Sequence, residues 1–280
     1  MKHKRRVSPS HVVIYIVLIL WALTTVTPFL WVVMSSFKDK DLIELQSFSL
    51  HFTPTLENYI KTFEKPPQSV WMAYWNSLLI SGVVTVGVIL LAGMASFAMV
   101  RYRFRGKRFL EGLIVASLMF PVFSTIIPVF QMMYKLNVVD NPVGVILPQI
   151  AGNLSFAIVI LMGYIRGMPV DLEESAFLEG CNVFQVFYKV IIPISRPAFA
   201  TVGIFSFLWS YNDLFTQLFF LRSAKNWTIT RFLNEVSSKY GTDYGMMCAV
   251  VTLIFIPVMI VYIFLQKNII KGLTAGAIKG

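Results

Sequence analysis

The amino-acid sequence predicts an all-α integral membrane protein with six transmembrane helices and a cytoplasmic helix-turn-helix between the fourth and fifth of them. Composition is the first observation behind this prediction. Hydrophobic residues make up 56% of the chain and charged residues only 14%, which leaves too little polar surface for a soluble globule of 280 residues. The second observation is that apolar residues gather in runs of roughly 20, the length at which a helix spans a bilayer.

Five of these runs contain no Asp, Glu, Lys or Arg, and a sixth contains a single carboxylate. They are Val12–Met34, Trp71–Val100, Gly112–Tyr134, Asn141–Ile165, Pro197–Leu221 (broken only by Asp213) and Tyr244–Gln266. The first run is too long for a removable signal peptide and lacks a small-x-small cleavage site, so we expect it to stay on the mature protein. Pro121, Pro128 and Pro257 predict kinks in the third and sixth helices.

Lys and Arg predict the orientation, because cytoplasmic segments near helix ends carry an excess of both. With six spans the two termini share one side of the membrane. Placing this side in the cytoplasm puts fifteen of the 24 basic residues there, including five in RYRFRGKR at residues 101–108. We expect this loop to anchor two helices against anionic lipid, with contact to a partner protein as the alternative. The basic residues are spread over four loops, which argues against nucleic-acid binding.

The sequence contains no recognisable catalytic or metal-binding set. His3, His11 and His51 fall in the N-terminal tail and an outer loop, and no Cys-x-x-Cys pair occurs. No Gly-x-x-x-x-Gly-Lys-Ser/Thr loop is present to hold a nucleotide, so we expect that any ATP used by the protein is bound by another chain. Cys181 and Cys248 lie at different levels of the expected bundle, which argues against a disulfide.

The segment EESAFLEGCNVFQVFYKVIIP, residues 173–193, is the exception to the apolar character of the chain. Four acidic residues, Asp171, Glu173, Glu174 and Glu179, fall within the nine positions 171–179, which begin two residues before this segment. An amphipathic hairpin resting on the membrane surface is one interpretation. Helices that bind membrane surfaces favour Lys and Arg, however, whereas four carboxylates suit a basic partner protein.

Local signals predict two short helices meeting at a corner in this segment. Asp171 with Glu174 forms a capping-box pattern, and Asn182 with Gln185 repeats it for the second helix. Gly180 is expected to close the first helix in the left-handed conformation. A proline, Pro193, is expected to stop the second helix.

At this segment the sequence resembles a known family. Glu174-Ser175-Ala176, Gly180 and Val190-Ile191-Ile192-Pro193 resemble the Glu-Ala-Ala...Gly...Ile-x-Leu-Pro signature of permease subunits in bacterial ATP-binding-cassette importers. Ser, Val and Ile replace the signature's Ala, Ile and Leu. Further stretches are similar to the carbohydrate importers of the maltose-permease type: PFLWVVMSSFK, NSLLIS, RYRFRGKRFL, YIRGMPVDLEESAFLEG, WSYNDLF and the tail GLTAGAIKG.

The resemblance implies a single transmembrane domain over residues 1–280, with a cytoplasmic coupling loop at 167–196 and a cytoplasmic tail at 267–280. It implies a sugar importer built from a second related permease, two cytoplasmic ATPase subunits that bind ATP and Mg²⁺, and an extracellular solute-binding protein. No cofactor is expected in this chain. The implied ATPase-coupling residues are Glu173, Glu174, Ser175, Ala176, Gly180 and Pro193. We expect Glu174 to face a basic residue of the ATPase and Glu173 to matter less if it faces water.

A polar stripe in the fifth expected span is the candidate substrate path. Ser206, Ser210, Asp213 and Gln217 recur at spacings of four, three and four, which is one face of a helix. Trp209 and Asn212 lie beside this stripe, and Asn153 joins it from the fourth span. An intramembrane carboxylate usually faces a bundle interior or a wet path. Alternatively, Asp213 is hydrated at the outer mouth or caps a local helix break, and Asn153 with Gln149 only joins helices.

A self-sufficient secondary transporter or channel is the competing functional class. Such proteins carry intramembrane ionisable residues for ion coupling and often internal repeats. One intramembrane aspartate and no obvious half-to-half repeat argue against this class.

Overall fold

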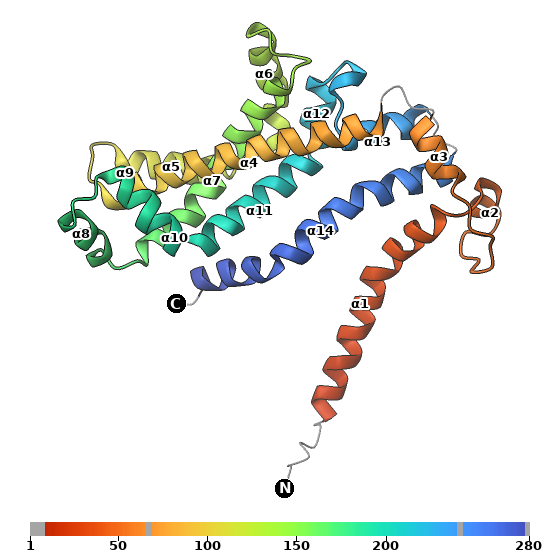
Figure 1. Ribbon diagram of the computed structural model, residues 1–280, viewed down its shortest axis with the longest axis horizontal. Helices are drawn as coiled ribbons and strands as arrows, with labels where there is room; N and C mark the ends of the chain where they lie inside the picture. The colour runs from red at the N-terminus through yellow and green to blue at the C-terminus, as the bar shows by residue number, and fades with distance from the viewer. Residues whose placement is uncertain (1–8, 65–68, 240–242, 278–280) are drawn as a thin grey trace. The chain divides into compact units, whose positions relative to one another are not determined.

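The computed structural model describes residues 9–64, 69–239 and 243–277, and among these residues it contains helices and no strand (Figure 1). The helices are α1 Pro9–Ser35, α2 Lys40–Leu45, α3 Glu57–Glu64, α4 Val70–Arg101, α5 Lys107–Ser117, α6 Val122–Lys135, α7 Pro142–Arg166, α8 Asp171–Leu178, α9 Val183–Val186, the π-helical turn η1 Phe187–Ile191, α10 Ile192–Ile194, α11 Arg196–Asn212, α12 Leu214–Phe220, the 3₁₀ turn η2 Ala224–Asn226, α13 Ile229–Lys239 and α14 Tyr244–Ala277. Lys2, Lys4, Arg5 and Arg6, and the last three residues of the expected C-terminal tail, lie outside the described residues.

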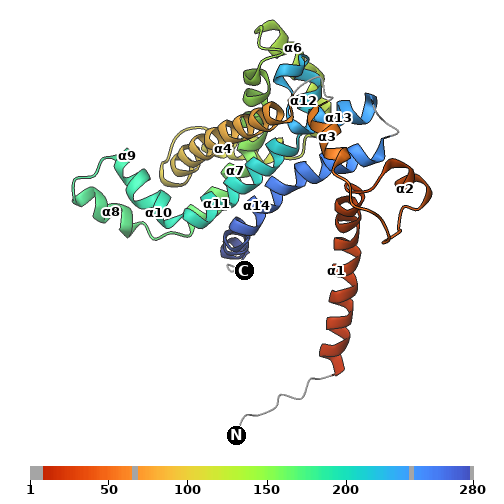
Figure 2. The same cartoon turned by 45° about the vertical axis from the view of Figure 1, so that its right-hand side comes forward.

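The chain forms two compact units. One comprises residues 1–66 and 233–256, and the other comprises residues 67–232 and 257–280. In the second unit α4, α7 and α11 pack side by side (Figure 2). Ile80, Val84, Val88 and Ala92 recur every four residues along α4 and are fully buried, so one face of this helix forms the centre of the bundle.

Small residues allow the helices of this bundle to approach closely. A Cβ atom on Gly93 of α4 would lie 2.8 Å from the ring of Phe199 on α11 and 3.2 Å from the ring of Phe187 in η1. Glycine is therefore the residue that lets two aromatic rings contact the backbone of α4 at this point.

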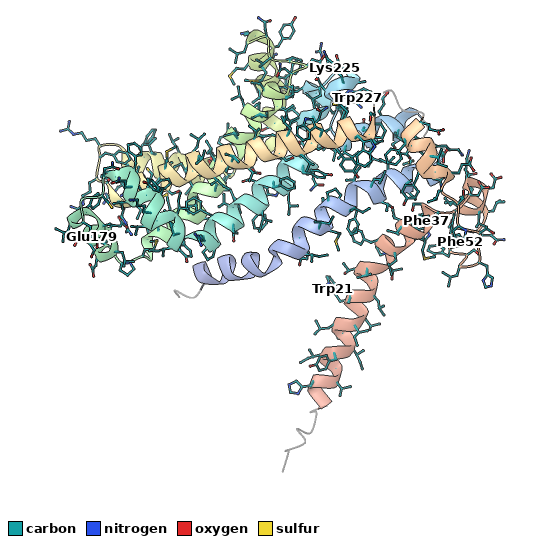
Figure 3. All side chains as sticks on the ribbon, in the orientation of Figure 1. Trp21, Phe37, Phe52, Glu179, Lys225 and Trp227 are labelled. Atoms are coloured by element: carbon teal, nitrogen blue, oxygen red, sulfur yellow. The ribbon has the colours of Figure 1, made fainter. Side chains whose placement is uncertain are left out.

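In the first unit α3 is held between the end of α1 and the start of α14. The amide of Asn58 donates to the carbonyl oxygens of Ser36 and Lys38 over 2.9 and 2.8 Å, and a Cβ on Gly245 would lie 2.6 Å from Asn58 Oδ1. The buried ammonium of Lys38 donates to the Ser47 carbonyl and lies 5.2 Å from the centroid of the Phe52 ring, which Figure 3 labels.

Helix lengths and apolarity qualify α1, α4 and α7 as candidate membrane spans among the described residues. The bent pair Val183–Ile194 and Arg196–Asn212, with 83° between its halves, raises this number to four at most. The expected third span, Gly112–Tyr134, is not one helix: α5 ends at Ser117 and α6 begins at Val122. Helical geometry is disfavoured for the residue before a proline, which explains why the helix is interrupted at Pro121 and not only kinked. The count of six spans remains a prediction.

Candidate functional site

The acidic segment begins as the helix α8, but not through the expected capping box. Its N-cap residue is Val170 in helical geometry, and no side chain caps it. Asp171 is therefore already helical, and the predicted pairing of Asp171 with Glu174 is wrong. Three carboxylates in the first turn still interact favourably with the free amides at a helix start.

Gly180 closes α8 with a φ of +85°, as the sequence predicts. The amide of Gly180 donates to the Phe177 carbonyl and that of Cys181 donates to the Ala176 carbonyl, each over 3.0 Å. These two hydrogen bonds together form a Schellman motif, which requires the left-handed conformation at the glycine. Cys181 and Cys248 are free thiols.

The second half of the segment starts with the predicted capping box. Asn182 Oδ1 accepts from the Gln185 amide over 2.9 Å, and Gln185 Oε1 accepts from the Asn182 amide over 2.8 Å. Pro193 does not stop this helix as expected, because it lies inside α10 and helical geometry continues to Ile194. The π-helical turn η1 precedes it, which is one way for a chain to accommodate the missing N–H of proline.

The coupling residues implied by the resemblance differ in exposure. Glu174, Ser175 and Gly180 are exposed, Pro193 is half-buried and Ala176 is buried. Glu173 does not face water: only 3% of it is exposed, and its Oε1 lies 2.6 Å from Arg101 Nε. Sequence reasoning missed this pair because Arg101 lies in the basic loop that we expected to contact lipid.

The second unit contains a half-open cavity of about 790 Å³ between α7, the α5–α6 break and the α11–α12 break. Five of the seven predicted path residues line it, namely Asn153, Trp209, Ser210, Asn212 and Asp213. Ser206 and Gln217 are buried elsewhere. Gln217 Nε2 donates to the Ser210 carbonyl over 3.0 Å, and its Oε1 accepts from the hydroxyls of Thr228 and Thr230.

The polar stripe is not one face of a continuous helix, because α11 ends at Asn212 and α12 starts at Leu214. Asp213 caps α12, with Oδ1 accepting from the Thr216 amide over 3.1 Å. Its other oxygen, Oδ2, accepts from Gln149 Nε2 over 2.8 Å, and Ser210 Oγ donates to Gln149 Oε1 over 2.6 Å. Asp213 therefore caps a local break and also lines the cavity. Gln149 of α7 is thus bonded to Ser210 of α11 and to Asp213, which is the helix-joining role given as its alternative, and it also lines the cavity.

Aromatic rings form the apolar wall of the cavity. The rings of Phe156 and Trp209 lie 4.7 Å apart between centroids, and those of Phe123 and Phe215 lie 4.8 Å apart across the two helix breaks. Among the described residues that line the cavity, Asp213 is the only ionisable one. Hydroxyls, amides and one carboxylate beside aromatic faces suit a neutral polyhydroxylated ligand.

Residues 86–275 match the model of a family described as the inner membrane component of binding-protein-dependent transport systems. The chain belongs to this family. Among the permease's relatives, the arabinooligosaccharides transport system permease protein AraQ of Halalkalibacterium halodurans is 32% identical over 262 residues, covering 92% of this chain and 93% of the relative. The diacetylchitobiose uptake system permease protein NgcG of Streptomyces coelicolor is 30% identical over 264 residues, covering 94% of this chain and 87% of the relative.

The permease also resembles a chain in the crystal structure of a bacterial ABC transporter involved in the import of the acidic polysaccharide alginate. The TM-score is 0.78 at 22% identity, and the match covers 95% of this chain and 99% of the other. At this identity the likeness establishes the fold.

Proposed function

We propose that the chain is one of two related permease subunits in an ATP-driven importer of neutral oligosaccharides. The complex contains two cytoplasmic ATPase subunits, one of which binds the loop at residues 167–196 of this chain, and an extracellular solute-binding protein delivers the sugar. ATP and Mg²⁺ bind in the ATPase subunits and not in this chain. Family membership and relatives that include two oligosaccharide permeases support this proposal.

The outward face of α8 is the observation that best supports ATPase coupling. Glu174 and Glu179 are exposed there, and Leu178 is 90% exposed. A large apolar side chain held in solvent beside carboxylates suits a partner surface that is both basic and partly apolar. Figure 3 labels Glu179 at this end of the second unit, and Lys225 and Trp227 at the other end.

Six spans with both termini in the cytoplasm fit this arrangement if α5 and α6 together cross the membrane once, and α11 and α12 together cross it once. The spans are then α1, α4, α5–α6, α7, α11–α12 and α14. Non-helical backbone at membrane depth is tolerated where it lines a cavity, and both breaks line the cavity around Asp213. The exposed apolar side chains of α1 face lipid or the second permease in this arrangement.

The lining of the cavity supports neutral sugars as the substrate class. Burying a carboxylate-bearing sugar next to Asp213 is unfavourable where no Lys or Arg is present to compensate its charge, and the described lining residues include neither. Trp209 and Phe156 provide the aromatic faces on which the apolar side of a pyranose ring packs.

The test is uptake into vesicles that contain the whole complex with its binding protein. ATP is supplied on the side of the ATPase subunits. Uptake of a panel of neutral oligosaccharides is then compared with uptake of a panel of uronic-acid oligosaccharides. We expect ATP-dependent uptake of neutral oligosaccharides. ATP-independent uptake driven by an ion gradient would instead support a secondary transporter, and preferential uptake of uronates would contradict the proposed substrate class.

A further inference from the structure

The last turn of α4 carries two contacts to the loop that follows α7. At its end, Arg101 Nε donates to Glu173 Oε1 of α8 over 2.6 Å, and Arg101 Nη2 donates to the Met168 carbonyl over 3.2 Å. One turn earlier, the ring of Phe97 lies 5.7 Å from that of Phe187 in η1. Because residues four apart share a helix face, one face of α4 contacts both halves of the loop.

The ion pair of Arg101 and Glu173 is enclosed by protein. The side chains of Arg101 and Glu173 are 12% and 4% exposed. The carbonyl that Arg101 also binds belongs to Met168, whose Sδ accepts from Ser195 Oγ at the corner between α10 and α11. Arg101 therefore connects α4, the end of α7, α8 and, through Met168, the start of α11.

A second ion pair in the same unit provides the contrast. Arg166 Nη2 lies 2.9 Å from Glu111 Oε1, but these side chains are 55% and 29% exposed. Exposed pairs contribute little and hold no fixed geometry, whereas a buried pair with additional hydrogen bonds fixes the position of the groups that carry it. Of these two pairs, only the buried one joins the acidic helix to the bundle.

We propose that Arg101 is a positioning residue for coupling: through Glu173 and the Met168 carbonyl it holds α8 so that displacement of α8 by the ATPase subunits is transmitted to α4 and α11. Glu173 thus connects α8 to α4 within this chain, whereas the exposed face of α8 around Glu174 contacts the ATPase. This inference rests on the proposed function.

The variant Arg101→Met/Glu173→Met tests this assignment. It removes both charges and all their hydrogen bonds but keeps similar volumes and leaves no unpaired buried charge, so we expect the chain to insert and pair with its sister permease. The matched control is Glu111→Gln at the exposed pair. Each complex is purified with its ATPase subunits, its melting temperature is measured, and ATP hydrolysis and sugar uptake are followed in vesicles with the binding protein.

We expect normal assembly and melting in the double variant, with the ATP hydrolysed per sugar transported rising about tenfold or more. The control should keep the wild-type ratio. A wild-type ratio in the double variant overturns the inference, and so does a lower melting temperature with hydrolysis and uptake falling in parallel, since this would reduce the pair to a role in stability. ATP-dependent uptake by the wild-type complex is checked first, because its absence would count against the proposed function and not against the assignment of Arg101.

Discussion

Gln149 of α7 donates to Asp213 at the break between α11 and α12, over 2.8 Å from Nε2 to Oδ2, and the same amide accepts from Ser210 Oγ. One glutamine thus orients two of the polar side chains that line the cavity, Ser210 of α11 and Asp213 at the break. A hydrogen bond to a charged group contributes roughly 1.5–3 kcal/mol, so this network keeps the carboxylate in one position beside the aromatic wall.

Asp213→Asn is expected to impair uptake without disturbing assembly. The Asn side chain still offers an oxygen to cap α12, but its amide group opposes the amide of Gln149, and one hydrogen bond of the network is lost. We predict that sugar uptake falls about tenfold, as the loss of a charged hydrogen bond implies, in vesicles that contain the complete complex. Ser206→Ala is the control, because Ser206 does not line the cavity; equal uptake in both variants would remove Asp213 from the path.

Gly180→Val is expected to weaken ATPase binding through backbone strain alone. A Cβ at Gly180 would meet nothing within 4 Å, so the penalty is the roughly 1–2 kcal/mol of a left-handed residue, and more for a β-branched one. We predict that about tenfold less ATPase subunit co-purifies, and that Gly180→Asn, which tolerates this conformation, retains most of it.

Gly106→Val provides a matched control for this strain. Gly106 lies in the loop between α4 and α5, has the same φ of +85° and also has open space around its Cβ position. We expect ATPase binding to survive this change. If both valine variants lose the ATPase subunits equally, the geometry of α8 is not what matters.

Local signals were sufficient for part of the loop. The capping box at Asn182 and the left-handed glycine at 180 depend on neighbours within a few residues, so the sequence alone predicts both. The partners of Glu173 and Asp213 are not local, because Arg101 and Gln149 lie 72 and 64 residues away from them. Helical periodicity predicted one continuous polar face across Asp213. In the structure the helix is interrupted there, and Asp213 is the N-cap of α12.

Asp140 links pH to stability outside the spanning helices. Burial raises the pKa of this carboxyl, but hydrogen bonds from Ser223, Asn226 and Arg222 outweigh burial and hold the pKa below its ordinary value of 3.8. A lowered folded pKa means that the stabilisation is complete above the ordinary value and is lost as pH falls through the lower one.

We therefore predict that melting of the purified permease shows a pH dependence below about pH 4 that Asp140→Asn reduces. Asparagine suits the positive φ of 62° at this position, so the comparison isolates the charge. Identical melting profiles of the two proteins across pH 5 to 3 would show that the hydrogen bonds do not depend on ionisation.

The six-span topology predicts opposite labelling of two exposed positions. Leu178 at the end of α8 is 90% exposed and Leu50 in the first unit is 76% exposed. With Cys181 and Cys248 replaced by Ser, we expect Leu178→Cys to react with impermeant reagents only from the cytoplasm and Leu50→Cys only from outside. Labelling of both from one side would contradict the topology.

The contact between Glu174 and the ATPase subunits is the central claim, and co-purification of these subunits with Glu174→Ala tests it most directly. Removing one partner of a desolvated charge pair at an interface costs roughly 2–5 kcal/mol. The variant should remain inserted and paired with its sister permease but bind at least about tenfold less ATPase and lose ATP-driven uptake. Glu44→Ala, which removes an exposed carboxylate in the first unit, should change neither. Wild-type ATPase stoichiometry and uptake in Glu174→Ala would contradict the account.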